Sequence, residues 1–224
     1  MTETSQHLDS LKEIKSMMEK SSRFVSLSGL SGISAGICAL IGASLAHFKI
    51  KEFYSSWNAR VQHYSTIKQS GNAGLIQLNT STNLTIDLVA IAVVSLIAAI
   101  IFSTLFTARR AKKKSQSLWN STSRRLLLNM GLPLVSGGLF CLILLKHNLF
   151  GLLAPTTLIF FGLALINGSK FTLPEIKYVG VINIFLGLLN GLFIGYGLVF
   201  WALGFGVVNI VYGIYMYMKY ERTA

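Results

Sequence analysis

The sequence predicts an all-α protein, a polytopic bundle of transmembrane helices with six spans, both chain ends in the cytoplasm and an N-terminal amphipathic helix. Of the 224 residues, 52% are hydrophobic and only 12% are charged, whereas about 25% are charged in an average soluble domain. The mean hydropathy is +0.58. The apolar residues also gather in long runs, and this patterning is typical of a membrane protein.

The apolar runs define the individual spans, because a transmembrane helix needs about 20 predominantly apolar residues. The predicted spans cover about residues 24–46, 84–106, 126–145, 149–166, 178–195 and 198–218. The last two belong to one apolar tract, and Gly195-Tyr196-Gly197 near its middle predicts a hairpin turn. The transmembrane domain therefore extends over residues 24–219.

The distribution of Lys and Arg predicts the orientation, because cytoplasmic connections carry an excess of positive charge. One side of the six-span topology holds most of the 20 basic residues, namely Lys12, Lys15, Lys20, Arg23, Arg109, Arg110, Lys112, Lys113, Lys114, Arg124, Arg125, Lys170, Lys177, Lys219 and Arg222. The other side holds Lys49, Lys51, Arg60, Lys68 and Lys146. The richer side is predicted to be cytoplasmic, and a five-span topology loses this agreement at the C-terminus.

The same distribution excludes nucleic acid as a partner, although the net charge is +12. The basic residues stand between apolar runs, where they set orientation and do not form a soluble basic face. The run at residues 24–46 is about twice the 7–15 residues of a signal-peptide core. It is therefore expected to remain as the first span, although Ser44-Leu45-Ala46 resembles a cleavage site.

Two extramembrane segments have a helical pattern. In residues 1–23, Leu8, Leu11, Ile14 and Met18 recur at helical spacing, which favours an amphipathic helix on the inner leaflet over a solvated tail. In the outer loop, residues 48–83, aromatic and apolar residues continue at helical spacing after the first span. The first span is thus expected to continue outward as a helix.

Glycines at intervals of four residues predict close helix packing, because a helix face without side chains lets a neighbouring backbone approach. Gly32 and Gly36 form such a row on the first span, and Gly187, Gly191 and Gly195 form another on the fifth. The same spacing also suits glycines that line a moving gate, but static packing is the commoner use.

Candidate metal ligands lie at the predicted outer face, where His47, His63, His147 and Asp87 fall near span ends. They offer imidazole and carboxylate ligands, but their spacing matches no metal motif. Ordinary interfacial residues are therefore the favoured interpretation. No nucleophile elbow, phosphate-binding loop or carboxylate pair occurs, so no catalytic residue and no cofactor is expected.

Several stretches resemble an uncharacterised family of small polytopic inner-membrane proteins from Bacteroidota-type bacteria. They include Ser21-Ser22-Arg23-Phe24, Ala154-Pro155 and Phe200-Trp201-Ala202-Leu203-Gly204-Phe205-Gly206. The resemblance implies a location in the bacterial cytoplasmic membrane and a multi-pass topology. Some members of that family are labelled carotene oxygenases, enzymes that hold iron with four histidines. His7 is predicted on the opposite side of the membrane from the other three histidines, so this chain lacks that ligand set.

The expected function is a non-enzymatic accessory, scaffold or sensor subunit, with the lipid bilayer and either another membrane protein or a second copy as partners. A small transporter or channel is the alternative, for which asparagines are the available polar groups within the spans. The third hypothesis is a membrane enzyme that acts at the outer face or on lipid.

Overall fold

The structure is a computed structural model that describes residues 29–69, 81–113 and 121–220, and within these ranges all regular secondary structure is helical. The α-helices are α2 (Gly29–Gln69), α3 (Ser81–Lys113), α4 (Ser121–Lys146), α5 (Leu153–Gly168), α6 (Ile176–Leu192), α7 (Gly197–Trp201) and α8 (Asn209–Tyr220). The described residues also contain two 3₁₀ turns, η1 (Phe150–Leu152) and η2 (Ile194–Tyr196), and one π-helical segment, η3 (Ala202–Val208). The prediction of an all-α protein is confirmed for the described ranges.

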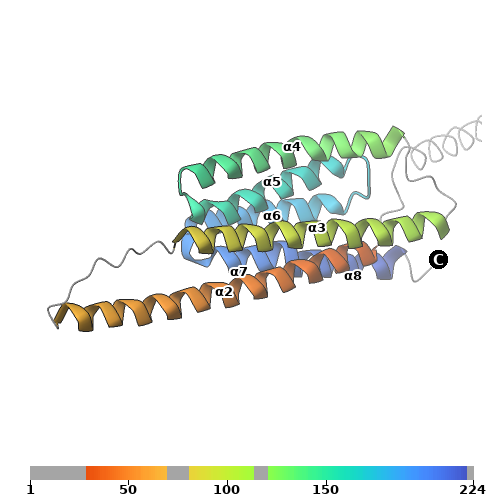
Figure 1. Cartoon of the computed structure of the whole chain (residues 1–224). Helices are drawn as coiled ribbons and strands as arrows, with labels where there is room; N and C mark the ends of the chain where they lie inside the picture. The colour runs from red at the N-terminus through yellow and green to blue at the C-terminus, as the bar shows by residue number, and fades with distance from the viewer. Residues whose placement is uncertain (1–28, 70–80, 114–120, 221–224) are drawn as a thin grey trace, which may run out of the picture.

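The helices run alongside one another in a bundle (Figure 1). α3 packs on α2, and α2 packs in turn on η3 and α8, so the first and last long helices are neighbours although they are far apart in sequence. α5 and α6 form the most extensive pair and also contact α7, while α4 lies against α5. The core thus consists of α2, α5, α6 and the continuous stretch α7, η3 and α8.

Among the described helices, five are long and apolar enough to cross a membrane: Gly29–Asn58, Leu84–Arg110, Thr122–Lys146, Phe150–Gly168 and Ile194–Tyr220. The predicted span at residues 178–195 corresponds to α6, an apolar helix of only 17 residues. At 1.5 Å per residue it measures about 26 Å, slightly less than the roughly 30 Å of a hydrocarbon core.

Many apolar side chains of these helices are exposed on the surface of the bundle, whereas the surface of a soluble protein carries mostly polar side chains. Leu132 on α4 is 71% exposed and Leu192 on α6 is 77% exposed, and none of the most apolar part of α3 is buried. Exposed apolar faces of this extent are characteristic of contact with lipid or with another protein. The protein is therefore a membrane helix bundle.

α2 is a single helix of 41 residues, which corresponds to about 60 Å, roughly twice the hydrocarbon core. It runs past the ends of the other described helices (Figure 1). The first span thus continues as one helix beyond its apolar run, as predicted, and its outward direction stays a prediction. The predicted amphipathic helix in residues 1–23 lies outside the described residues.

The hairpins between α4 and α5 and between α6 and α7 turn at the end toward which α2 extends (Figure 1). After α4, Asn148 has a positive φ of 57°, and the amide of Leu149 donates to the carbonyl of Leu144 at 2.9 Å. This is a Schellman ending, in which asparagine tolerates the left-handed conformation. α6 ends at Leu192 before η2, so the hairpin turn predicted at residues 195–197 is confirmed within one or two residues.

The last long helix contains a π-helical segment that the sequence pattern does not predict. η3 interrupts the α-helical repeat over Ala202–Val208. The side-chain amide of Asn209 donates to the carbonyl oxygens of Phe205 at 2.9 Å and Gly204 at 3.4 Å. The side chain of Asn209 therefore supplies a hydrogen-bond donor to two backbone carbonyl oxygens of the π-helical segment.

Candidate functional site

The packing of α2 against the last span defines the most distinctive part of the bundle. A Cβ atom added at Gly36 would lie 2.7 Å from the carbonyl oxygen of Gly206, and one at Gly213 would lie 2.6 Å from that of Gly29. At Gly32 the distance to the Cα of Gly213 would be 3.2 Å. The two backbones are therefore in contact along this row. A methyl group added to a glycine on either helix would force them apart.

A second backbone contact joins α5 and α6. A Cβ at Gly162 would lie 2.5 Å from the carbonyl oxygen of Gly180, and one at Gly180 would lie 2.7 Å from that of Gly162. Gly187 lies two turns further along α6. A Cβ added there would lie 3.0 Å from the carbonyl oxygen of Pro155. These three glycines are the closest points of the α5–α6 pair.

The predicted continuation of this row through Gly191 and Gly195 is wrong for the described part of the chain. A Cβ at either glycine would meet no atom within 4 Å. The reason is that α6 ends at Leu192 and the chain turns through η2, so these positions point into open space at the hairpin. The true partners of Gly187 lie on α5.

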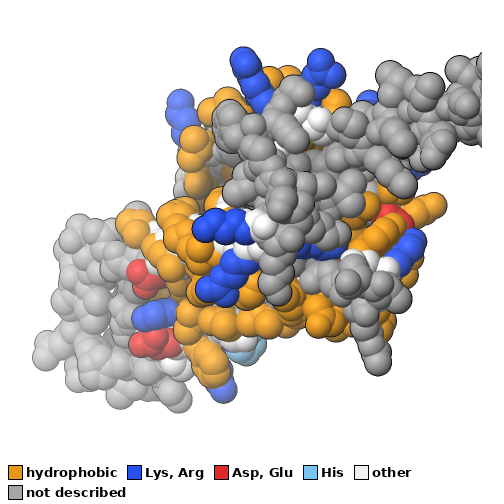
Figure 2. All heavy atoms as spheres, turned by 90° about the vertical axis from the view of Figure 1, so that its right-hand side faces the viewer, with side chains coloured by type: hydrophobic (Ala, Val, Ile, Leu, Met, Phe, Trp, Pro, Cys, Tyr) orange, Lys and Arg blue, Asp and Glu red, His pale blue; other side chains and the backbone are white. Residues whose placement is uncertain are grey.

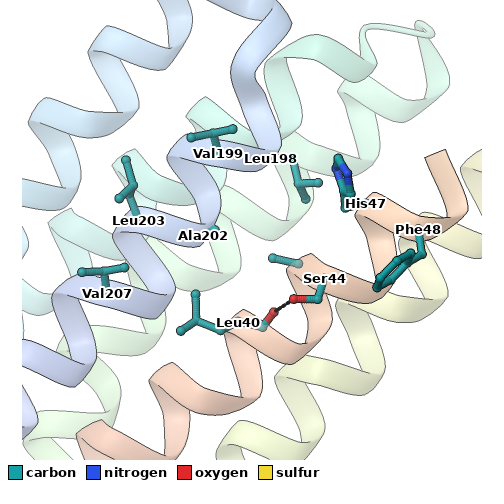
Figure 3. Close-up of a pocket in the computed structure, with 10 residues that line it drawn as sticks. Leu40, Ser44, His47, Phe48, Leu198, Val199, Ala202, Leu203 and Val207 are labelled. Atoms are coloured by element: carbon teal, nitrogen blue, oxygen red, sulfur yellow. Dashed lines mark hydrogen bonds between the residues drawn. The ribbon is translucent and has the colours of Figure 1, made fainter. Parts of the chain in front are cut away.

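Beyond the glycine row, α2 and the last span separate and leave a groove of about 390 Å³ (Figure 3). Leu40 from α2 contacts Gly206 where the groove closes. The groove is lined by residues of both helices: Leu40, Ala43, Ser44, His47 and Phe48 from α2, and Leu198, Val199, Ala202, Leu203 and Val207 from α7 and η3. Its walls are apolar, and the polar side chains of Ser44 and His47 stand toward its outer end (Figure 3).

Two asparagines of α6 are completely buried. Asn183 and Asn190 have no exposed surface, and the side chain of Asn183 donates to the carbonyl of Val179 at 2.9 Å. The amide oxygen of Asn183 and both polar atoms of Asn190 have no hydrogen-bond partner among the described residues. Asn183 faces Gly204 in η3, and Asn190 faces Gly197 at the start of α7. Unpaired buried amides are costly, so these residues are candidates for a polar function.

A polar cluster ties the helices together at the opposite end from the groove. The carboxylate of Glu175, just before α6, accepts hydrogen bonds from Lys219 at 2.7 Å and from the hydroxyl of Tyr220 at 2.9 Å. Arg110 from α3 donates to the carbonyl oxygen of Tyr220 at 3.4 Å. Burial raises the pKa of the Glu175 carboxyl, but hydrogen bonds from Lys219, its own backbone amide and Tyr220, together with the charge of Lys219, outweigh burial and lower the pKa overall.

The basic residues predicted to set topology lie at this same end. Arg109, Arg110 and Lys112 are at the end of α3, and Arg124 and Arg125 are at the start of α4. The end of α3 and the start of α4 lie at the same end of the bundle (Figure 1), where Lys and Arg side chains stand around the rim (Figure 2). Lys113 closes α3, and Lys114 lies outside the described residues.

The candidate metal ligands are distributed over separate elements. His47 is exposed on α2, Asp87 is exposed on α3, and His147 is exposed in the turn after α4. The side chain of His63 lies outside the described part of the structure. Within the described residues, no three His, Cys, Asp or Glu side chains come close enough to hold one metal ion.

Sequence reasoning missed several of these features. The partners of the glycine rows, Gly162, Gly180, Gly206 and Gly213, carried a usable signal, since Gly206 and Gly213 are spaced by seven residues and so share one face of an α-helix. The groove and the Glu175 cluster had no sequence signal, because each depends on which helices become neighbours.

Comparison of the chain with protein-family models, with curated proteins and with solved structures finds no match.

Proposed function

We propose that this protein is a non-enzymatic accessory or scaffold subunit of a membrane-protein complex in the bacterial cytoplasmic membrane. The observation that carries the proposal is the extension of α2 beyond the other described helices (Figure 1). We propose further that the chain crosses the membrane six times, with both ends in the cytoplasm. The clustering of basic residues at one end of the bundle supports this orientation.

The part of α2 that leaves the bundle is suited to bind a partner protein, and we call residues 53–69 of this helix the docking arm. Most helical stability in proteins comes from packing against a neighbour, and isolated helices are marginal in water. On the arm, Phe53 stacks on Trp57 with ring centroids 6.3 Å apart, and Tyr54 is 60% exposed. Aromatic side chains are enriched in the buried centres of protein interfaces, so this face of α2 offers suitable anchors for a partner.

The other end of α2 is held firmly. Its glycine row touches the backbone of the last span, and α3 packs along its length. An arm that is continuous with a packed transmembrane helix keeps a defined direction relative to the bundle. This is the property that a scaffold requires.

Site-specific photo-crosslinking in living cells tests the proposal. A photoreactive phenylalanine analogue replaces Tyr54 on the arm, and the same analogue replaces Leu128, which is 64% exposed on α4, as the control. We expect Tyr54 to yield one discrete adduct heavier than the chain by the mass of another protein, whereas Leu128 yields none or only lipid adducts.

The outcome at Tyr54 decides between partners. An adduct with another membrane protein that also co-purifies stoichiometrically supports the accessory role. An adduct of twice the chain mass identifies a homo-oligomer, and no protein adduct at all excludes the docking arm.

A small transporter is the second candidate, and the buried asparagines favour it. Asn183 and Asn190 both lie toward the last span: Asn183 faces Gly204 in the π-helical segment, and Asn190 faces Gly197 at the start of α7. Polar groups within membrane helices commonly mark transport routes, and π-helical segments are frequent at functional sites. Ion flux in proteoliposomes that is lost in Asn190→Leu would favour this second function over the first.

A further inference from the structure

We propose that the groove between α2 and the last span binds one acyl chain of a glycerophospholipid, whose phosphate lies beside His47 and Lys51. The inference requires only that the bundle spans a bilayer and is independent of whether α2 docks a protein partner. It concerns the leaflet at the end of the bundle toward which α2 extends.

The shape of the groove follows from the helix contacts. On one side of Gly36 the backbones of α2 and the last span are in contact. The groove begins at Leu40, and the π-helical residues Ala202, Leu203 and Val207 form one of its walls. The groove is therefore a wedge that closes at Leu40 and opens toward His47 (Figure 3).

A wedge of this shape selects its occupant. A helix of a second copy is about 10–12 Å across with its side chains, so even one helical turn exceeds the volume of the groove, about 390 Å³. A single acyl chain is one methylene wide and flexible, and it can follow the wedge to its closed end. The volume of about 390 Å³ falls within the 300–1,000 Å³ typical of small-molecule sites.

The polarity of the groove changes in the direction that a phospholipid requires. Its inner part is lined by aliphatic side chains, including Leu40, Leu203 and Val207. His47 stands at the outer end beside Leu198 (Figure 3). Lys51 is exposed one turn further along α2, on the same helix face because residues four apart are neighbours. An imidazole and an ammonium group above an apolar wedge complement a phosphate joined to a hydrocarbon chain.

Native mass spectrometry of the full chain, released from nanodiscs that contain phosphatidylglycerol and phosphatidylcholine, tests the proposal. We expect the parent protein to retain one phospholipid per chain. Ala202→Leu, which fills the groove, should lose that lipid. Ala92→Leu should retain it, because Ala92 is exposed on α3 away from the groove and receives the same added side chain.

A second variant keeps the experiment decisive if Ala202→Leu does not fold. His47→Gln combined with Lys51→Gln changes only exposed side chains and leaves the groove open. Loss of the charge-assisted contacts should weaken phosphatidylglycerol binding about tenfold while thermal stability without lipid is unchanged.

Three results would overturn the proposal. They are a parent protein without retained phospholipid, equal retention by Ala202→Leu and Ala92→Leu, and a shift of Ala202→Leu from dimer to monomer without loss of lipid. The last would identify a second copy as the occupant. None of these results depends on the crosslinking at Tyr54, so the lipid site and the docking arm can fail separately.

Discussion

Single glycines determine how closely these helices approach, and their neighbours divide them into two groups. Gly162 faces a backbone oxygen of α6, so the site has no room for a methyl group. Gly191 occupies the same kind of helical position on α6, but an added Cβ would meet nothing. The spacing of glycines along one helix predicts a face suited to close packing, and only the partner helix shows which of them are used.

Gly162→Ala is expected to destabilise the protein by about 1–3 kcal/mol, because the new methyl group would overpack a tight interface. Gly191→Ala is the matched control. It should leave stability unchanged or raise it by up to about 1 kcal/mol, since alanine loses less conformational entropy than glycine in a helix. Equilibrium unfolding in mild detergent measures both free energies, and equal values for the two variants would contradict the contact between Gly162 and Gly180.

At the scale of elements, the π-helical segment of the last span is the main departure from a regular bundle. It adds width to the helix where the groove begins, and it presents Gly204 to Asn183 and Gly206 to Leu40. Hydrophobic periodicity does not reveal such a segment, because one extra residue per turn shifts an apolar pattern only slightly in a helix that is apolar on most faces. Asn209 provides the local polar support that makes it stable.

Asn209→Leu is expected to destabilise the last span by about 1 kcal/mol, because a leucine of similar size cannot donate to the carbonyl oxygens of Gly204 and Phe205. Asn129→Leu is the control. The side chain of Asn129 makes the same bond to a carbonyl four residues earlier, at 2.8 Å to Arg125, but in a regular, exposed part of α4. A loss of stability in Asn129→Leu as large as in Asn209→Leu would show that the π-helical segment does not depend on the side-chain amide.

At the scale of the whole molecule, the charges and the helix ends agree on one orientation. The ends of α3 and α8 and the start of α4 lie together at the basic end of the bundle, with the Glu175 cluster between α6 and the last span (Figures 1 and 2). α2 begins at this end and leaves the bundle at the other. The structure therefore gathers these helix ends at one end of the bundle, as the six-span topology requires, and the side of the membrane that this end faces stays a prediction.

Reporter fusions test the proposed six-span topology. Reporters placed after Lys114 and after Arg222 should both be cytoplasmic, and one inserted near Gly71 should be periplasmic, because the basic connections remain inside. α6 is the critical element because this apolar helix of 17 residues is shorter than each of the five described segments that are long enough to cross a membrane. A periplasmic C-terminus would show that α6 does not cross and would leave five spans.

The sequence by itself determined that the chain forms apolar helices, where most of them lie, that the first continues as a helix beyond its apolar run and where the last hairpin turns. These properties depend on local composition and on residue spacing within one segment, which are present in the chain before it folds. Only the tertiary structure decided that α2 pairs with the last span, that Gly187 packs on α5 while Gly191 does not, and that a groove opens above Gly36. In a bundle whose helices are apolar on nearly every face, the hydrophobic pattern does not distinguish lipid from protein neighbours. The choice of neighbours depends on where two backbones can come into contact, and that is a property of helix pairs.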